Sequence, residues 1–216
     1  NNKYWDGAFS KSDWGQYSSE DLIRFISKNC LQFKKKKILE IGCGTGANFN
    51  LFLDKKAHIT GVDFSEIAIN KANEKFKKDI IKKRINLIKS DIKSLNLKKR
   101  KFNILVDNCA TCCLSYEETK SFYYCVGKYL LKNSRVYIRT FATYSWGYKQ
   151  GKKLSYNRYL PTKWSKGLGP QRFSSIKDIK NILSKNFEIK SIEMISRTIN
   201  NRKHSIKEWV VDAKKK

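Results

Sequence analysis

Residues 38–49 read ILEIGCGTGANF, and this stretch decides the fold. It begins with apolar residues typical of a buried strand, and glycines follow at positions 42, 44 and 46. Because glycine has no side chain, the backbone N–H groups of such a turn can come close to a ligand. A helix that starts at the turn directs its N-terminal N–H groups to the same place. The stretch therefore predicts a strand, a turn and a helix that together hold a nucleotide-like cofactor.

The rest of the chain alternates in the same way. Further strands are predicted at the apolar segments 57–64, 85–92, 102–109 and 134–142, and helices at 65–80, 115–130 and 174–186. Segments 187–199 and 204–215 also read as strands, and the short turn NNRK between them makes them antiparallel. Strands joined by crossover helices form a parallel sheet covered on both faces. We therefore predict an α/β fold with a doubly wound, mostly parallel, seven-stranded sheet, helices on both faces and an antiparallel closing strand.

Two segments lie outside this alternation. Residues 1–36 are expected to form an N-terminal lid and lead-in helix, and residues 37–216 the core. Within the core, an insertion at about 143–172 is rich in aromatic residues, lysine and glycine. A long segment of this kind in a compact domain usually serves function. We therefore expect the insertion on the substrate side.

The glycine spacing alone leaves two classes of cofactor open. Gly42, Gly44 and Ala47 fit the dinucleotide fingerprint, and Asp63 lies at about the distance expected for a ribose-binding acid. A nicotinamide enzyme is therefore one alternative. Glu40 argues against it, because a carboxylate just before the first glycine is badly placed beside a pyrophosphate and better placed beside a cationic ligand.

Together these segments resemble the class I S-adenosylmethionine-dependent methyltransferases of the small-molecule type. EIGCGTG is similar to the first motif of that family, GVDFS to the second and SDI to the third. FNILVDNCATCCL is similar to the fourth strand with its substrate-side loop, so the resemblance covers about residues 37–141. It implies S-adenosyl-L-methionine as the cofactor.

The resemblance also implies which residues contact this cofactor. It places Glu40, Gly42, Cys43 and Gly44 at the methionine part, Asp63 and Phe64 at the ribose, Asp91 and Ile92 at the adenine, and Asp107 and Asn108 at the sulfonium and acceptor. The N-terminal stretch 4–26 resembles the lid of small-molecule methyltransferases, although Ser18 stands where those proteins have proline. By this likeness Trp14 and Tyr17 close over the cofactor and Arg24 meets its carboxylate.

The implied reaction is a direct displacement at the sulfonium methyl. Alignment and desolvation can supply roughly 7–11 kcal/mol of the barrier, so a strong general base is not always needed. Asp107 is the better acid or base, and His204 is the second catalytic candidate. The insertion interleaves aromatic residues with cations and offers a wall for an anionic ring or for RNA bases. Its predicted substrate-binding residues are Tyr144, Trp146, Tyr148, Tyr159 and Arg172.

The cysteines predict neither a metal site nor a disulfide framework. Cys109 and Cys112 have a C-x-x-C spacing, but no second pair completes a zinc site. The cysteines lie mostly in apolar stretches, which indicates reduced thiols and a cytoplasmic protein. No apolar run approaches the length of a membrane span, so we expect no membrane partner.

The formal net charge of +27 is extreme for 216 residues. It suits a polyanion such as nucleic acid, but the lysines fall all along the chain, so we attribute the charge mainly to composition. The function that we predict is methyl transfer to a small, anionic metabolite such as a sugar or nucleotide-sugar. An RNA methyltransferase and a non-catalytic cofactor-binding partner stay open as alternatives.

Overall fold

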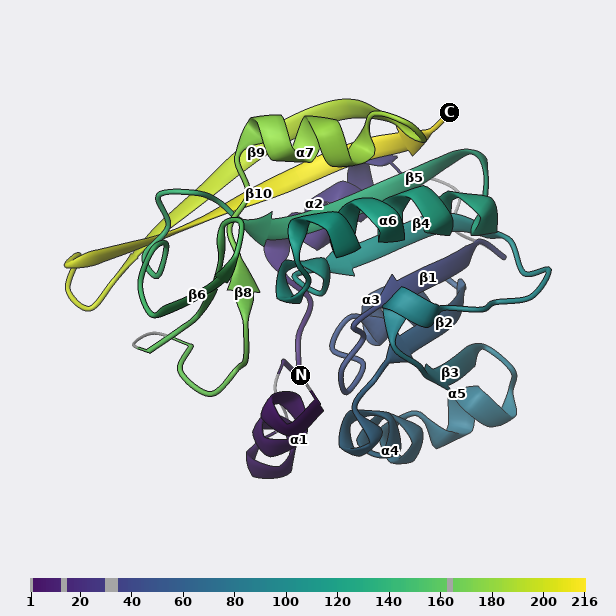
Figure 1. Cartoon of the computed structure of the whole chain (residues 1–216). Helices are drawn as coiled ribbons and strands as arrows, with labels where there is room; N and C mark the ends of the chain where they lie inside the picture. Colours follow the sequence, from purple (N-terminus) through teal and green to yellow (C-terminus); the bar gives the residue numbers. More distant parts are fainter. Residues whose placement is uncertain (1, 13–14, 30–34, 163–164) are drawn as a thin grey trace.

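A seven-stranded sheet forms the centre of the molecule (Figure 1). This computed structural model describes residues 2–12, 15–29, 35–162 and 165–216. In spatial order, the strands of the sheet are β3 (Ile85–Lys89), β2 (His58–Asp63), β1 (Lys37–Ile41), β4 (Phe102–Asn108), β5 (Leu130–Phe141), β10 (His204–Lys215) and β9 (Phe187–Ile199). The first five pair in parallel, whereas β10 is antiparallel to both of its neighbours. The predicted doubly wound sheet with an antiparallel closing strand is confirmed.

Helices cover both faces of the sheet because successive strand residues point to opposite sides. Leu39 and Leu105 pack on the face covered by α6 (Tyr116–Val126) and α7 (Ile176–Leu183). Ile38 packs on the other face, below α2 (Glu20–Asn29), α3 (Phe49–Asp54) and α4 (Glu66–Lys75). The strand order reverses between β1 and β4, and such a switch point leaves a crevice at the carboxyl ends of the strands.

The helix predicted over 65–80 is two helices in the structure, α4 and α5 (Lys77–Ile81). Phe76 separates them, because its ring turns into the core and contacts the ring of Phe49 at a centroid distance of 5.2 Å. Ser65 begins α4 as predicted, and its side-chain oxygen accepts a hydrogen bond from the backbone N–H of Ala68. Three short 3-10 helices complete the connections: η1 (Ile92–Ser94), η2 (Thr111–Cys113) and η3 (Gly127–Tyr129).

The N-terminal helix α1 (Asn2–Lys11) lies over the turn that follows β1. Phe9 is 4% exposed, and a Cβ atom at Gly44 would lie 3.1 Å from its ring. Ser65 also donates a hydrogen bond from its hydroxyl to the carboxylate of Asp6. These contacts join α1 to the start of α4 and to the glycine turn.

The insertion folds into a second, antiparallel sheet of three strands. Its strands are β6 (Lys152–Ser155), β7 (Arg158–Leu160) and β8 (Gln171–Arg172). Backbone hydrogen bonds connect the insertion to the large sheet, for example from Trp146 N–H to the carbonyl of Ser205. Tyr159 and Phe173 then pack against the cysteines of η2, so the small sheet stands beside the loop that follows β4.

None of the helices in the described ranges has the length and apolar character needed to span a membrane.

The N-terminus of α6 gives a test of local stability. Ser115 accepts a hydrogen bond from the Glu118 backbone, and the Glu118 carboxylate accepts one from the Ser115 backbone. Ser115→Ala removes half of this capping box, so we expect it to lower the free energy of unfolding by about 1 kcal/mol. Urea denaturation checks this. Ser121→Ala, on the exposed face of the same helix, is the control and should change the free energy of unfolding little. Equal losses in both variants would contradict the assignment.

Candidate active site

A cavity of about 280 Å³ opens at the carboxyl ends of the central strands. Its wall comes from the N-terminal region, the glycine turn after β1, the end of β2, the start of η1 and the loop after β4. The predicted cofactor residues that line it are Tyr17, Glu40, Gly42, Cys43, Gly44, Asp63, Phe64, Asp91, Ile92 and Asn108. The fold thus gathers residues that are far apart in sequence into one wall.

The glycine turn requires glycine for two reasons. Gly42 and Gly44 have φ angles of +60° and +53°, which residues with a side chain rarely adopt. A Cβ atom at Gly42 would also lie 2.4 Å from the Cβ atom of Ala110, in the loop after β4. The absence of a side chain therefore lets the turn and this loop meet directly and form the floor of the cavity.

Asp63 is fixed at the end of β2 by backbone donors. Its two oxygens accept hydrogen bonds from the N–H groups of Gly44 and Ser65, each at 2.9 Å. Burial raises the pKa of Asp63, although these hydrogen bonds act in the opposite direction. A carboxylate offers about four lone-pair positions, so two remain for donors in the cavity. A pair of ribose hydroxyl groups fits this capacity.

Glu40 carries an unsatisfied oxygen at the cavity. One carboxylate oxygen accepts a hydrogen bond from Asn48 Nδ2 at 2.6 Å, while the other is buried without a partner in the structure. Burial raises the pKa of Glu40 to about 8, and the nearby charge of Asp63 adds to the effect. An orphaned buried acceptor is costly unless a ligand supplies a donor. The ammonium group of S-adenosylmethionine has the charge and the donors to satisfy it.

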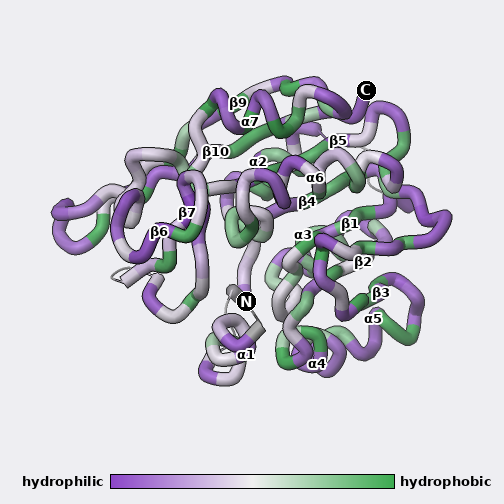
Figure 2. The backbone as a smooth tube through the Cα atoms, viewed as in Figure 1, coloured by the Kyte–Doolittle hydropathy of each residue, from purple (hydrophilic) through white to green (hydrophobic). Residues whose placement is uncertain are grey.

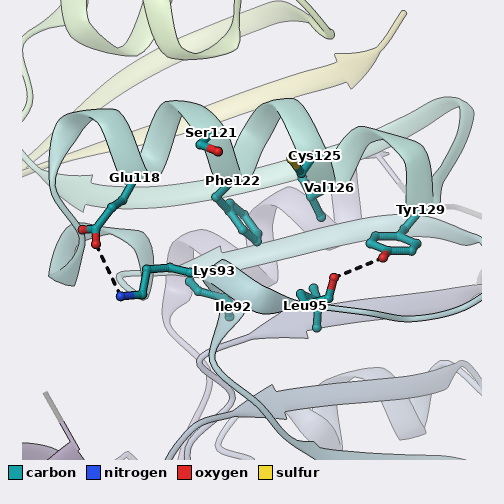
Figure 3. Close-up of a pocket in the computed structure, with 9 residues that line it drawn as sticks. All are labelled: Ile92, Lys93, Leu95, Glu118, Ser121, Phe122, Cys125, Val126 and Tyr129. Atoms are coloured by element: carbon teal, nitrogen blue, oxygen red, sulfur yellow. Dashed lines mark hydrogen bonds and ion pairs between the residues drawn. The ribbon is translucent and has the colours of Figure 1, made fainter.

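Asp91 and Ile92 line the cavity from the start of η1. Asp91 accepts a hydrogen bond from the backbone N–H of Lys93 at 2.9 Å, which begins the 3-10 helix. A second, smaller cavity of about 80 Å³ separates η1 from α6 (Figure 3). There Lys93 reaches toward Glu118 with an N–O distance of 3.4 Å, and the hydroxyl of Tyr129 donates to the carbonyl of Leu95. The helix α6 therefore holds η1 in place.

The structure does not bring Asp107 to the cavity. This carboxylate is fully buried and accepts hydrogen bonds from the N–H groups of Ala110 and Thr111 and from the hydroxyls of Thr111 and Tyr123. Burial raises its pKa. Both oxygens thus hold the loop after β4 against α6, so the geometry supports a positioning role rather than the expected contact with sulfonium or acceptor.

Two further predicted residues lie away from the cavity wall, and a third is not described by the structure. Arg24 is exposed on α2 and forms an ion pair with Glu20 at 2.7 Å, away from the cavity wall. His204 stacks on the ring of Trp146 at a centroid distance of 4.0 Å and likewise does not line the cavity. Trp14 lies outside the described residues.

The predicted acceptor residues divide into two groups. Tyr159 and Arg172 are buried, and Arg172 donates to the hydroxyls of Ser174 and Thr119, so it supports the base of the small sheet. Burial lowers the pKa of Arg172. The others are less buried: Tyr144 is 79% exposed, Tyr148 is half-buried against Tyr159 and Phe173, and Trp146 is half-buried against His204. None of the five predicted residues lines the cavity, so their contact with an acceptor stays a prediction.

Sequence reasoning missed several residues of the wall. Phe9 and Trp5 line the cavity from α1, a helix that the sequence pattern did not reveal. Asn48 was missed as the partner of Glu40, although a polar residue at the start of the following helix was a usable signal. Cys109 and Cys113 also line the wall, in a loop where Cys109 has a φ of +63°. No group of metal-binding side chains is found in the described ranges.

Comparisons with known proteins agree with this geometry. Residues 32–158 match a family model described as a methyltransferase domain. Protein arginine N-methyltransferase 1 of Schizosaccharomyces pombe is 32% identical over 118 residues, which are 50% of this chain and 34% of that protein. The chain thus spans about a third of the length of this curated relative.

Solved structures show the same fold. A SAM-dependent methyltransferase from Methanosarcina mazei superposes with a TM-score of 0.73 at 19% identity, covering 88% of this chain and 96% of that one. Magnesium protoporphyrin IX methyltransferase from Synechocystis PCC 6803, with bound SAM, gives a TM-score of 0.69 at 12% identity over 100% of this chain and 95% of that one.

The fold and the cavity define a class I, Rossmann-like methyltransferase. The family match covers more than half of the chain, so the chain belongs to the methyltransferase-domain family. Membership of this family favours a methyl donor as the cofactor over the nicotinamide alternative.

The raised pKa of Glu40 predicts proton-linked cofactor binding. A cation beside Glu40 favours its ionised form, so below about pH 8 binding must release a proton. We expect the affinity for S-adenosylmethionine to rise with pH and to level off above about pH 8. Calorimetry in buffers of different ionisation enthalpy measures the released proton, which Glu40→Gln should abolish. An affinity independent of pH in the unsubstituted protein would contradict this role.

The same variant should be more stable without cofactor. The pKa of Glu40 is raised on folding from an ordinary value of 4.5, so its ionised form destabilises the folded state progressively as pH rises between these values. We expect Glu40→Gln to raise the free energy of unfolding at neutral pH by about 1–3 kcal/mol. Thermal denaturation of the cofactor-free protein checks this. Glu74→Gln, on the exposed surface of α4, is the control and should change stability little.

Proposed function

We propose that the enzyme transfers the methyl group of S-adenosylmethionine to a small, anionic metabolite such as a sugar or nucleotide-sugar. The observation that carries this proposal is the roof that α1 forms over the cavity, beside a cationic insertion. The acceptor end of the cavity is the part bounded by Asn108, Cys109 and Cys113.

The roof favours a small acceptor. Phe9 lies over Gly44, and Trp5 packs with the cluster of Cys112, Cys113 and Tyr159. A Cβ atom at Gly169 of the insertion would lie 3.2 Å from the ring of Tyr4, so α1 also contacts the insertion. An acceptor therefore reaches the cofactor through a covered space, which suits a metabolite better than a folded protein or an RNA helix.

The charge of the insertion favours an anionic acceptor. Lys149, Lys152, Lys153 and Lys166 are exposed there. Arg158 lies closer to the cavity, because its guanidinium donates to the carbonyl of Cys113 at 2.7 Å. The Nε atom of Arg158 is buried without a partner in the structure and can bind an oxygen of a phosphate or carboxylate.

In the proposed complex, residues of the cavity bind and align the two substrates. Glu40 binds the ammonium group of the cofactor, Asp63 the ribose hydroxyls and Asp91 the adenine amino group, with Phe64 and Ile92 beside them. Asn108 borders the sulfonium and orients the acceptor. The cofactor supplies a methyl group on a positively charged sulfur, and alignment in a water-poor site contributes much of the rate.

Removal of the ribose-binding carboxylate tests the cofactor site. We expect Asp63→Ala to weaken S-adenosylhomocysteine binding by about 100-fold or more, because two hydroxyl groups lose a charged acceptor. Isothermal titration calorimetry measures the effect. Asp54→Ala, an exposed acid at the end of α3, should bind like the unsubstituted protein. Unchanged binding in Asp63→Ala would disprove the assigned role.

Turnover tests the acceptor class. The enzyme should release S-adenosylhomocysteine with phosphorylated sugars or nucleotide-sugars, and less with neutral sugars or RNA. We expect Arg158→Gln to raise KM for the anionic acceptor by about tenfold without changing cofactor affinity. Arg197→Gln, exposed on β9, is the matched control. Turnover on RNA alone would favour the RNA alternative, and cofactor binding without any turnover would favour the non-catalytic alternative.

A further inference from the structure

The end of the sheet opposite the cavity carries a dense group of cations. Every loop that leads into one of the first four parallel strands has them: 35–37 before β1, 55–56 before β2, 82–84 before β3 and 98–101 before β4. Strand β10 runs the other way, and its end, 214–216, is also lysine. These five segments are named the amino edge. All but Arg84, Lys214 and Lys215 are exposed.

These segments form one continuous surface. Lys35 N–H donates to the carbonyl of Lys56 at 3.2 Å, and His58 N–H donates to that of Lys36 at 2.8 Å. The ammonium group of Lys101 donates to the carbonyl of Lys128, in η3 directly before β5. Figure 2 shows the hydrophilic tube along this end of the sheet. The lysines are dispersed in the sequence, but the parallel sheet brings their separate loops to the same end of the molecule.

Among the described residues, few cations of the amino edge face a carboxylate. Arg84 forms an ion pair with Asp79 at 3.4 Å, and Glu188 on β9 lies opposite Lys214. The acids of the cofactor site, Glu40, Asp63 and Asp91, lie at the opposite end of the strands. The cations of the amino edge thus lie at the opposite end of the strands from the acids of the cofactor site, and the lysines of the insertion form a separate group.

Exposed apolar side chains accompany the cations. Ile81 is 70% exposed directly before segment 82–84, and Leu131 is 43% exposed beside Lys132 at the start of β5. Lysine predominates over arginine, and lysine acts as a point charge without the planar, bidentate geometry that favours nucleic-acid recognition. Tyr124 is the exposed aromatic residue near this end, and the ammonium group of Lys185 lies 3.9 Å from the centre of its ring. One face of that ring is therefore occupied.

We propose that the amino edge binds the surface of an anionic lipid bilayer. Lysines near such a surface are attracted by its negative potential, and isolated apolar side chains can enter the headgroup region. Loops at one end of a sheet reach a flat surface together, whereas a nucleic-acid strand contacts only part of them. The bound enzyme presents its cavity to the solution. This inference differs from the sequence-based expectation of no membrane partner, because the clustering exists only in the folded chain.

Sedimentation with vesicles tests the proposal. The probes are vesicles of equal parts phosphatidylcholine and phosphatidylglycerol, vesicles of phosphatidylcholine alone, and polyuridylate RNA. The edge variant replaces five exposed lysines with glutamine: Lys36, Lys55, Lys82 and Lys99 in four segments of the amino edge, and Lys132 beside them in β5. The matched control removes the same charge elsewhere: Lys120, Lys153, Lys177, Lys180 and Lys203, all exposed.

The unsubstituted protein should bind the anionic vesicles and not the neutral ones. We expect the edge variant to bind at least about 100-fold more weakly and the control variant less than about fivefold more weakly. Equal losses in both variants would show an effect of net charge alone and overturn the proposal. Binding to RNA without binding to anionic vesicles would overturn it in favour of a nucleic-acid surface.

A second variant tests the apolar contacts separately. Replacement of Ile81 and Leu131 with serine should weaken binding to anionic vesicles by about tenfold and leave RNA binding unchanged. Ile176→Ser, exposed at the start of α7, is its control. All variants should retain S-adenosylhomocysteine affinity, since none of the substituted residues lines the cavity. If both the serine variant and the edge variant bind vesicles as well as the unsubstituted protein, the amino edge is not the lipid-binding surface and the proposal is overturned.

Discussion

The close approach of the glycine turn to the loop after β4 is the constraint on which the rest of the site depends. No side chain fits between Gly42 and Ala110, so the two segments form a single floor. The backbone of Gly44 then reaches the carboxylate of Asp63, and the loop after β4 is fixed in turn by Asp107. Three neighbouring strands are thereby tied at their carboxyl ends, and the cavity above them has a defined shape before any ligand enters.

The buried acids of this cavity lower the stability of the empty protein and favour the binding of a cation. Glu40 and Asp63 are both buried, and burial raises the pKa of each. Two such acids near each other disfavour their own ionised forms in the empty site. In the proposed complex a positively charged cofactor reverses this balance, because it would satisfy the orphaned oxygen of Glu40 and favour ionisation. The buried acids therefore lower the stability of the folded protein most when the site is empty, and a cationic methyl donor would relieve this cost.

The sequence predicted the sheet, and it picked out residues that line one cavity, because both depend on local patterns. Short apolar segments and one glycine turn define the strands and their order of connection, and strand ends place Glu40, Asp63 and Asp91 at one edge. The failures are of another kind. Asp107 and Arg172 have partners on another element, the helix α6, and sequence spacing does not show this. Arg24 pairs with Glu20 on its own helix, and its spacing does not show that it faces away from the cavity. The helix α1 and the clustering of lysines were missed for the same reason, since each depends on the folded arrangement.

The helix α1 has a consequence for the timing of the catalytic cycle. Phe9 covers the glycine turn and Asp6 is hydrogen-bonded to Ser65, so this helix lies across the route by which a ligand would leave. If cofactor exchange follows this route, α1 must undock each time. The residence time of the product is in that case set by the few contacts of a short terminal helix rather than by the full set of interactions inside the cavity. Small changes at Asp6 or Phe9 would then alter how often the enzyme turns over without altering the chemical step.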